Sequence, residues 1–289
     1  MEQRDGFSTH SSFTPHPSER NIKLVLEYDG SGYHGWQRQA GSLSIQEVIE
    51  SRLGVMLGKR VGIRASGRTD AGVHAKGQVV NFHARTRLTP EEILRGLNSL
   101  LPGDIVVLSA EEVGEDFHAR FSAVSKVYEY HVLNSPVPSA LLRNYAWHVR
   151  RPLSVEPMKE CLERIRGRND FSAFMATGSG ASSTERNMLR AELVRLRSDR
   201  LKFTYEANGF LRHMVRNLTG TIVEVGKGKW TSGDFERIIR SGDRKQAGMT
   251  APGHGLYLIS VNYQRGEFSR NELSEWSEKN EIIREIRQD

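Results

Sequence analysis

Residues 187–207, NMLRAELVRLRSDRLKFTYEA, carry the pattern that decides the fold. Apolar and polar residues alternate over 201–207, residues 187–196 also mix the two kinds closely, and a short polar turn around Asp199 separates the two stretches. Alternation with a period of two is typical of a strand that buries one face, and a short turn joins antiparallel neighbours. The segment therefore predicts a strand pair in an antiparallel sheet.

The same kind of pattern predicts further elements on both sides of this pair. Strands are expected at 21–29, 78–83, 105–108, 127–133 and 256–263. Helices, indicated by apolar residues at helical spacing and by capping residues, are expected at 44–57, 89–101, 154–167, 210–225 and 234–240. Strands that come mostly in runs, with helices laid on one face, favour an α+β fold over a doubly wound sheet.

The chain length of 289 residues is enough for about two domains. Pro136, Pro138 and Pro152 cluster between the two halves and place the boundary near 134–151. We expect four parts, which are a flexible N-terminal extension (1–20), a first α/β subdomain (21–140), a second α/β subdomain (141–265) and a charged C-terminal tail (266–289).

The charge is basic overall and unevenly placed, with 41 Lys or Arg against 35 Asp or Glu and a net charge of +6. Residues 59–87 hold seven Lys or Arg and one acid, and residues 186–229 hold ten and four. Two separated basic blocks suggest a polyanion-binding surface assembled from both halves. The alternative is scattered surface charge that serves solubility, and basicity alone does not distinguish RNA from DNA.

Several classes of protein are disfavoured by composition. No apolar run approaches the ~20 residues that a membrane span needs, and residues 1–20 lack the apolar block of a secretory signal. Cys161 is the single cysteine, which excludes an intrachain disulfide or a cysteine-built zinc site and fits a reducing, cytoplasmic location. It is expected to be a small buried apolar residue rather than a catalytic thiol.

The most unusual segment is the loop ASGRTDAGVHA at residues 65–75, in which two glycines bracket Arg68 and Asp70. Small residues let a ligand approach closely and leave the carboxylate exposed. Because neighbouring positive charge favours the ionised form, Asp70 is a candidate nucleophile or base and not a general acid. The alternative is an aspartate that only caps the loop in an Asx-turn.

Other motifs in the sequence give weaker indications of a functional site. No pair of histidines has zinc-helix spacing, residues 226–229 (GKGK) lack the frame of a phosphate-binding P-loop, and no Gly-x-Ser-x-Gly elbow occurs. In residues 209–217 (GFLRHMVRN), Arg212 and Arg216 are four apart, so the expected helix places both on one face. One could contact phosphate and the other a carboxylate, or both could simply be solvated.

Several of these segments, in order, resemble one family, the tRNA pseudouridine synthase A family. The segments that carry the resemblance are YDG at 28–30, GWQRQ at 35–39, GRTDAGVHA at 67–75, LP at 101–102, FHAR at 117–120, KVYEY at 126–130, FLRHMVRN at 210–217, AGMTAP at 247–252 and GLYL at 255–258. Any one of them could arise by chance, whereas the ordered set from about residue 28 to 263 is highly specific. Arg212 and the pair Gly253-His254 depart from the usual pattern.

The resemblance implies an isomerase that converts uridine to pseudouridine at positions 38–40 of the tRNA anticodon stem-loop. It implies two similar α/β subdomains around a central basic cleft, a homodimer, and neither a metal nor an organic cofactor. Asp70 becomes the catalytic aspartate, Tyr128 the active-site tyrosine that binds the substrate, Arg216 the ion-pair partner of Asp70, and Arg68 a helper that holds the loop or a phosphate.

The implied chemistry is consistent with these residue types. The target base must be flipped into a pocket, at a cost of about a few kcal/mol, and Tyr128 can stack on it. Asp70 can attack C1′ of the ribose or take a proton from C2′. Two rival hypotheses are a non-catalytic tRNA-binding protein on the same scaffold and a synthase that acts on another RNA.

Overall fold

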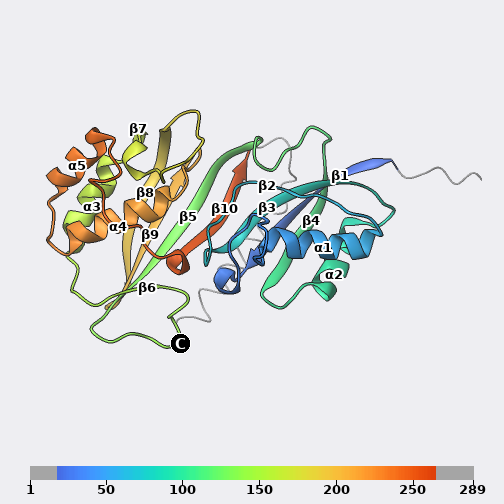
Figure 1. Ribbon diagram of the computed structural model, residues 1–289, viewed down its shortest axis with the longest axis horizontal. Coiled ribbons are helices and arrows are strands. Elements are labelled where there is room, and N and C mark those ends of the chain that lie inside the picture. The colour runs from blue at the N-terminus through green and yellow to red at the C-terminus, as the bar shows by residue number, and fades with distance from the viewer. Residues whose placement is uncertain (1–17, 265–289) are drawn as a thin grey trace, which may run out of the picture.

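The computed structural model describes residues 18–264, which form one ten-stranded sheet with five α-helices (Figure 1). The strands are β1 (Glu19–Tyr28), β2 (Arg64–Ala65), β3 (His74–Arg85), β4 (Ile105–Val113), β5 (Ala123–Asn134), β6 (Trp147–Val149), β7 (Gly167–Asp170), β8 (Glu185–Arg197), β9 (Arg200–Ala207) and β10 (Leu256–Tyr263). The helices are α1 (Ile45–Leu57), α2 (Pro90–Leu100), α3 (Val155–Arg164), α4 (Met214–Gly226) and α5 (Ser232–Ser241). Short 3-10 turns lie at Gly30–Gly32, Ser172–Phe174 and Gly253–Gly255.

The sheet is mostly antiparallel, in the order β4-β1-β3-β10-β5-β9-β8-β7, with β2 beside β3 and β6 beside β5. Only the pairs β10–β3 and β5–β6 are parallel among the described strands. The strand pair expected at 187–207 is β8 and β9, in which Ala191 faces Tyr205 and Leu193 faces Phe203. The predicted α+β fold, with mainly antiparallel strands, is confirmed.

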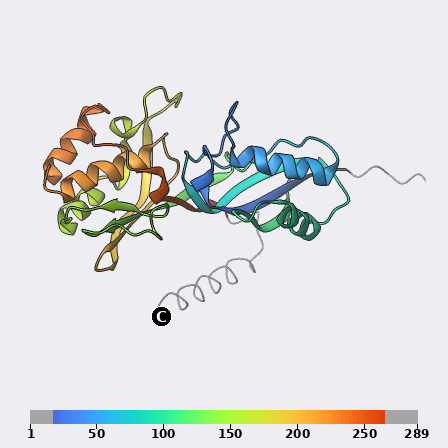
Figure 2. The same ribbon diagram turned by 60° about the horizontal axis from the view of Figure 1, so that its bottom comes forward.

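Strand β10 occupies the middle of the sheet, although it lies at the C-terminal end of the described chain. It pairs with β3 from the first half and with β5 on its other edge. Helices α1 and α2 lie at one end of the molecule and α3, α4 and α5 at the other, as both ribbon views show (Figures 1 and 2). The division into subdomains at residues 140 and 141 stays a prediction, and the predictions for 1–20 and 266–289 fall almost wholly outside the described residues.

Helices α1, α2 and α5 begin where a capping side chain accepts a hydrogen bond from a free backbone amide of the first turn. The hydroxyl of Thr89 accepts from the Glu92 amide at 3.2 Å, and the Glu92 carboxylate accepts from the Thr89 amide at 2.8 Å. Their apolar faces then pack into the core: Ile93 and Leu97 of α2 are completely buried. In α3, Cys161 is also completely buried, and burial raises the pKa of its thiol to about 12, as the structural interpretation of this cysteine requires.

The helix expected at 210–225 begins later, at Met214, and this prediction was wrong for its first turn. His213 has a left-handed backbone, with φ of 63°, the one positive φ at a non-glycine residue in the described chain. Phe210 lies in the irregular segment before α4. Its ring packs edge-on against the ring of Tyr128, with centroids 4.9 Å apart. Arg212 is therefore exposed ahead of the helix, and it does not share a helical face with Arg216.

Candidate active site

The loop that carries Asp70 links β2 to β3 and is fixed to the sheet by buried polar groups. The Ser66 amide donates to the Val79 carbonyl at 2.8 Å, and the Ser66 hydroxyl donates to Gln78 Oε1 at 2.7 Å. Gln78 Nε2 donates in turn to the Gly67 carbonyl at 2.9 Å. Since Ser66 and Gln78 are completely buried, these bonds hold the start of the loop in one conformation.

The far side of the same loop rests on the segment that follows β1. The hydroxyls of Tyr28 and Thr69 share a hydrogen bond of 2.8 Å, and the Trp36 amide donates to the Thr69 carbonyl at 2.9 Å. Gly35 makes this approach possible because its φ is 90° and a Cβ there would lie 2.6 Å from the Thr69 carbonyl oxygen. The YDG and GWQRQ segments therefore contact the Asp70 loop and hold it in place.

Asp70 faces the N-terminal end of α4. Arg216 Nη1 donates to Asp70 Oδ2 at 2.8 Å, and His213 Nε2 lies 3.5 Å from Oδ1. The Asp70 side chain keeps 29% of its exposure, whereas that of Arg216 keeps 16%. The carboxylate is thus aimed by a charge-assisted hydrogen bond and is still accessible to a ligand.

Arg216 is itself held by the closing segment of the described chain. Its Nε donates to the Ala251 carbonyl at 2.7 Å, and the Ala251 amide donates back to the Arg216 carbonyl at 3.1 Å. Two residues on, a Cβ at Gly253 would lie 2.4 Å from the Ala71 carbonyl oxygen, so this position needs glycine for the closing segment to approach the loop. The GRTDAGVHA, FLRHMVRN and AGMTAP segments therefore meet at Asp70.

Tyr128 lies on β5, next to Leu258 of β10 and Tyr205 of β9 in the sheet register. Its side chain is buried, and burial, followed by the charges of Tyr28 and Asp70, raises its pKa well above the ordinary value. Its hydroxyl has no hydrogen-bond partner within residues 18–264. The ring is thus wedged against Phe210, and its hydroxyl stays protonated over the physiological pH range.

Comparison with known proteins bears on the same segments. A family model described as tRNA pseudouridine synthase matches residues 24–122 and 162–264. The matched residues include Asp70 and Arg216. They also include β9 and β10, the two strands that pair with the strand of Tyr128. The chain belongs to the tRNA pseudouridine synthase family. It is therefore an RNA pseudouridylate synthase, an isomerase.

Individual relatives of this synthase are similar over nearly their whole length. The chain is 43% identical over 244 residues to a protein named tRNA pseudouridine synthase A from Thermoanaerobacter sp. (strain X514), covering 84% of this chain and 100% of the relative. Proteins of the same name from Ruminiclostridium cellulolyticum and Acetivibrio thermocellus are also 43% identical, over 244 and 245 residues, with the same coverage.

Arg68 lies apart from the Asp70–Arg216 pair. Its side chain is exposed and has no hydrogen-bond or ion-pair partner in the part of the chain that the structure describes. Gln78 and Tyr28, rather than Arg68, hold the loop. Its role as a helper that holds the loop or a phosphate stays a prediction.

Two residues of the synthase's site were missed by sequence reasoning. His213 was given no role in the sequence analysis, although its Nε2 lies 3.5 Å from Asp70 Oδ1. Burial lowers the pKa of His213, against the opposing effect of the Asp70 charge. Lys126, part of the KVYEY segment, donates from Nζ to the Ser66 carbonyl at 2.5 Å. His213 is next to Arg212 and Lys126 is two positions before Tyr128, and this closeness to singled-out residues was the available signal.

Within residues 18–264, no group of three or more His, Cys, Asp or Glu side chains is arranged to hold a metal ion. The helices in that range include none that is long and apolar enough to cross a bilayer.

Proposed function

We propose that this synthase converts uridine to pseudouridine at positions 38–40 of the tRNA anticodon stem-loop, with Asp70 as the catalytic aspartate. The observation that carries the proposal is the accessible Asp70 carboxylate, held at 2.8 Å by Arg216 in a loop fixed on both sides. The printed names of the relatives supply tRNA as the substrate class. The nucleotide positions follow from the family resemblance of the motifs.

The reaction is an isomerisation, so it needs no external reactant. The bond between N1 of uracil and C1′ of ribose breaks, the base turns, a bond between C5 and C1′ forms, and the proton on C5 is lost while N1 gains one. Asp70 acts on the sugar, either by attacking C1′ or by taking the C2′ proton. Both routes need an aimed carboxylate, which is what the Arg216 contact provides.

The target uridine reaches Asp70 only after leaving its stack, which costs about a few kcal/mol. Tyr128, which lies on β5 close enough to Asp70 for that charge to raise its pKa, offers a ring on which the flipped base stacks. Such a contact is worth about 1–3 kcal/mol for bases on aromatic side chains. Arg68 is exposed in the loop that carries Asp70, and we expect it to contact a phosphate of the flipped nucleotide.

Stacking by the Tyr128 ring gives a test of this arrangement. We expect Tyr128→Phe to keep turnover within ~3-fold of wild type, because the ring remains, and Tyr128→Ala to lose ~10- to 100-fold, as lost stacking predicts. Rates on a tRNA transcript, with melting temperatures to check folding, measure both. Equal losses in the two variants would instead assign the function to the hydroxyl.

The function as a whole is tested by mapping pseudouridine in tRNA from cells with and without the protein. We expect pseudouridine at positions 38–40 to disappear when the gene is deleted and to return when the wild-type chain is supplied. Purified protein should produce the same modification on unmodified tRNA. Loss at other tRNA positions or in another RNA would overturn the assigned target.

We further propose that the synthase acts in the cytoplasm as a homodimer. The family resemblance supports the dimer, and the single buried thiol of Cys161 fits a reducing compartment. Light scattering of the purified protein measures its mass directly, and a monomer at working concentration would contradict the dimer.

A further inference from the structure

Phe121 is a large apolar side chain left in solvent. It keeps 75% of its exposure, the highest value among aromatic side chains of residues 18–264, and lies in the turn between β4 and β5. Burial of such a ring would lower the free energy of the folded state, so an exposed ring adds little to the stability of the fold. A single exposed apolar residue is common in proteins, so the groups that surround Phe121 decide whether this surface can bind a ligand.

The turn that presents Phe121 is rigid. The Ser122 amide donates to the His118 carbonyl at 2.9 Å, and the Arg120 amide donates to His118 Nδ1 at 3.1 Å. Ala119, completely buried, donates from its amide to Asn81 Oδ1 at 3.0 Å. Phe121 is therefore held out from an anchored turn, and a ligand would meet a preformed ring.

Cations and a second ring surround Phe121. The His118 ring lies 4.4 Å from it between centroids, and Arg120 Cζ lies 5.4 Å from its centroid. Burial, and then the charge of Arg64, lower the pKa of His118, and burial, then Arg120, lower that of Lys126 to about 8. Arg64, Arg120 and Lys126 thus lie within electrostatic range of this cluster.

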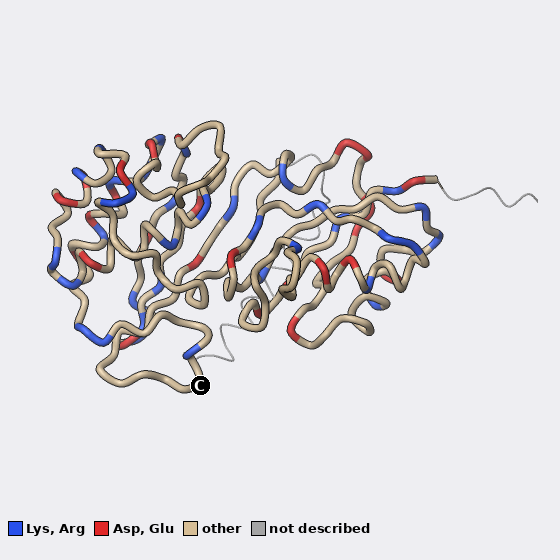
Figure 3. Tube along the Cα trace, in the orientation of Figure 1, with Lys and Arg blue, Asp and Glu red and all other residues tan. Residues whose placement is uncertain are grey.

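These three cations have no carboxylate partner within 4 Å among the described residues, so their charge is available to an anion. We call the surface formed by Arg64, His118, Arg120, Phe121 and Lys126 the Phe121 patch. Figure 3 shows Lys and Arg along the half of the molecule that carries α1 and α2, as well as along the half that carries α3, α4 and α5. An aromatic ring set among unpaired cations is the composition of surfaces that bind unpaired nucleotides.

The Phe121 patch is continuous with the candidate active site through Lys126. Lys126 Nζ donates to the Ser66 carbonyl, and a Cβ at Gly67 would lie 3.0 Å from the same nitrogen. Asp70 follows three residues later in the same loop. RNA bound with a uridine at Asp70 would therefore extend its neighbouring nucleotides toward Arg120 and Phe121.

We propose that the Phe121 patch binds an unpaired nucleotide next to the target uridine, with its base stacked on Phe121 and its phosphate on Arg120 and Lys126. This inference rests on the proposed function, because it takes the RNA strand to pass Asp70. Stacking on a single ring tolerates any base, so the patch adds affinity and fixes the register of the loop without reading its sequence.

The test compares Phe121→Ala with Phe121→Trp, and uses Leu189→Ala, which removes an apolar side chain 51% exposed on β8, as the matched control. Equilibrium binding of an unmodified anticodon stem-loop RNA is measured at several salt concentrations, together with KM and kcat. We expect Phe121→Ala to weaken binding and raise KM ~5- to 100-fold with little change in kcat, while Phe121→Trp and Leu189→Ala bind like wild type.

A charge variant separates stacking from phosphate contact. Arg120→Met should weaken binding and lower the slope of log affinity against log salt by about one, whereas Phe121→Ala leaves that slope unchanged. A 2-aminopurine placed in turn at each unpaired loop position should report quenching at one position in the wild type and lose it in Phe121→Ala.

Three outcomes would overturn the inference: wild-type affinity of Phe121→Ala, no position-specific quenching in the wild type, or a Phe121→Ala defect in self-association alone. The last would identify the patch as a contact between copies of this chain. The binding measurement does not depend on turnover. Failure of the proposed function would appear as wild-type protein that forms no pseudouridine, so the two failures can be told apart.

Discussion

Asp70→Asn should abolish pseudouridine formation, by at least ~10³-fold in turnover, while tRNA binding persists. The amide has the shape of the carboxylate and can still accept the hydrogen bond from Arg216 Nη1. It cannot act as a nucleophile on C1′ or take the C2′ proton, because it is neutral and a much weaker base. Loss of turnover with retained affinity is therefore the signature of a reacting group.

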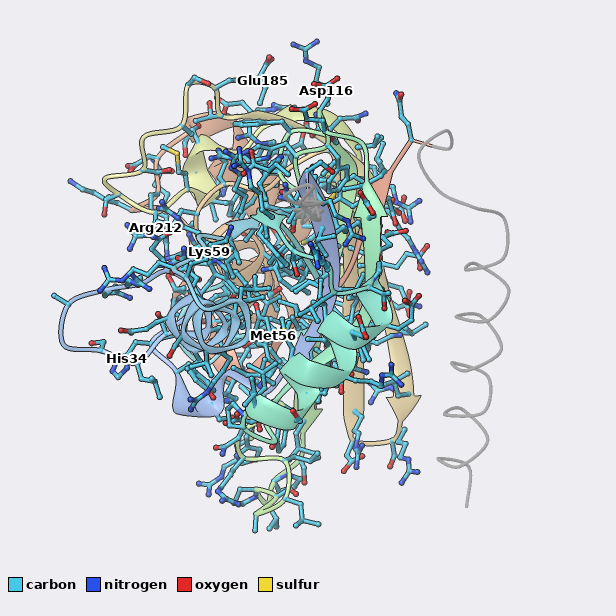
Figure 4. The ribbon with its side chains drawn as sticks, turned by 90° about the vertical axis from the view of Figure 1, so that its right-hand side faces the viewer. His34, Met56, Lys59, Asp116, Glu185 and Arg212 are labelled. Carbon is cyan, nitrogen blue, oxygen red and sulfur yellow. The ribbon has the colours of Figure 1, made fainter. Side chains whose placement is uncertain are left out.

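Asp116→Asn is the matched control, because the same change is made at an exposed carboxylate that Figure 4 places at the edge of the molecule. Its turnover should equal that of wild type. Turnover of Asp70→Asn within ~10-fold of wild type would remove Asp70 from the reaction, since loss of a reacting group costs far more. Loss of tRNA binding in that variant would reassign Asp70 to substrate recognition.

Arg216→Met should lower kcat by ~10²- to 10³-fold with a smaller change in KM, as loss of one preorganised electrostatic partner does in other enzymes. The variant leaves Asp70 without its ion-pair partner and removes the bond to the Ala251 carbonyl. Arg216→Lys should be intermediate, because a single ammonium cannot reproduce the two directed contacts of a guanidinium.

Arg212→Met provides the comparison within the same motif. Arg212 is exposed ahead of α4, on the side of the molecule where Lys59 and His34 also project in Figure 4. Its loss should leave kcat within ~3-fold of wild type and act, if at all, on tRNA affinity. Equal kcat losses in the Met variants of both arginines would contradict a specific role for the Asp70–Arg216 pair.

Regular elements with a clear period were predictable from the sequence. The last strand, β10, has the expected bounds, Leu256–Tyr263, and β8 and β9 lie where the strand pair was predicted. Strands β2, β6 and β7 were not predicted, because two to four residues are too few to show a period. The late start of α4 could not be predicted either, because the helical pattern of residues 210–225 carries no signal for the left-handed backbone of His213.

The site was predictable as a set of motifs and not as a geometry. Local charge could not decide whether Arg212 or Arg216 lies near a carboxylate, whereas the family resemblance pointed to Arg216. The contact between Arg216 and Asp70 joins residues that are 146 positions apart in the sequence. The approach of His213 to Asp70 and the bond from Lys126 to Ser66 are also long-range. Such contacts depend on how the strands are ordered, which the periodicity of each segment leaves open.

The central place of β10 makes the geometry around Asp70 depend on residues that are synthesised long after Asp70 itself. A nascent chain that ends before residue 251 already contains Asp70 and Arg216, yet it lacks the Ala251 carbonyl that orients the guanidinium and the strand that fits between β3 and β5. Residues 251–263 must therefore leave the ribosome before the Arg216 contact and the pairing of β10 with β3 and β5 can form. We expect nascent chains that end before residue 251 to be inactive toward uridine.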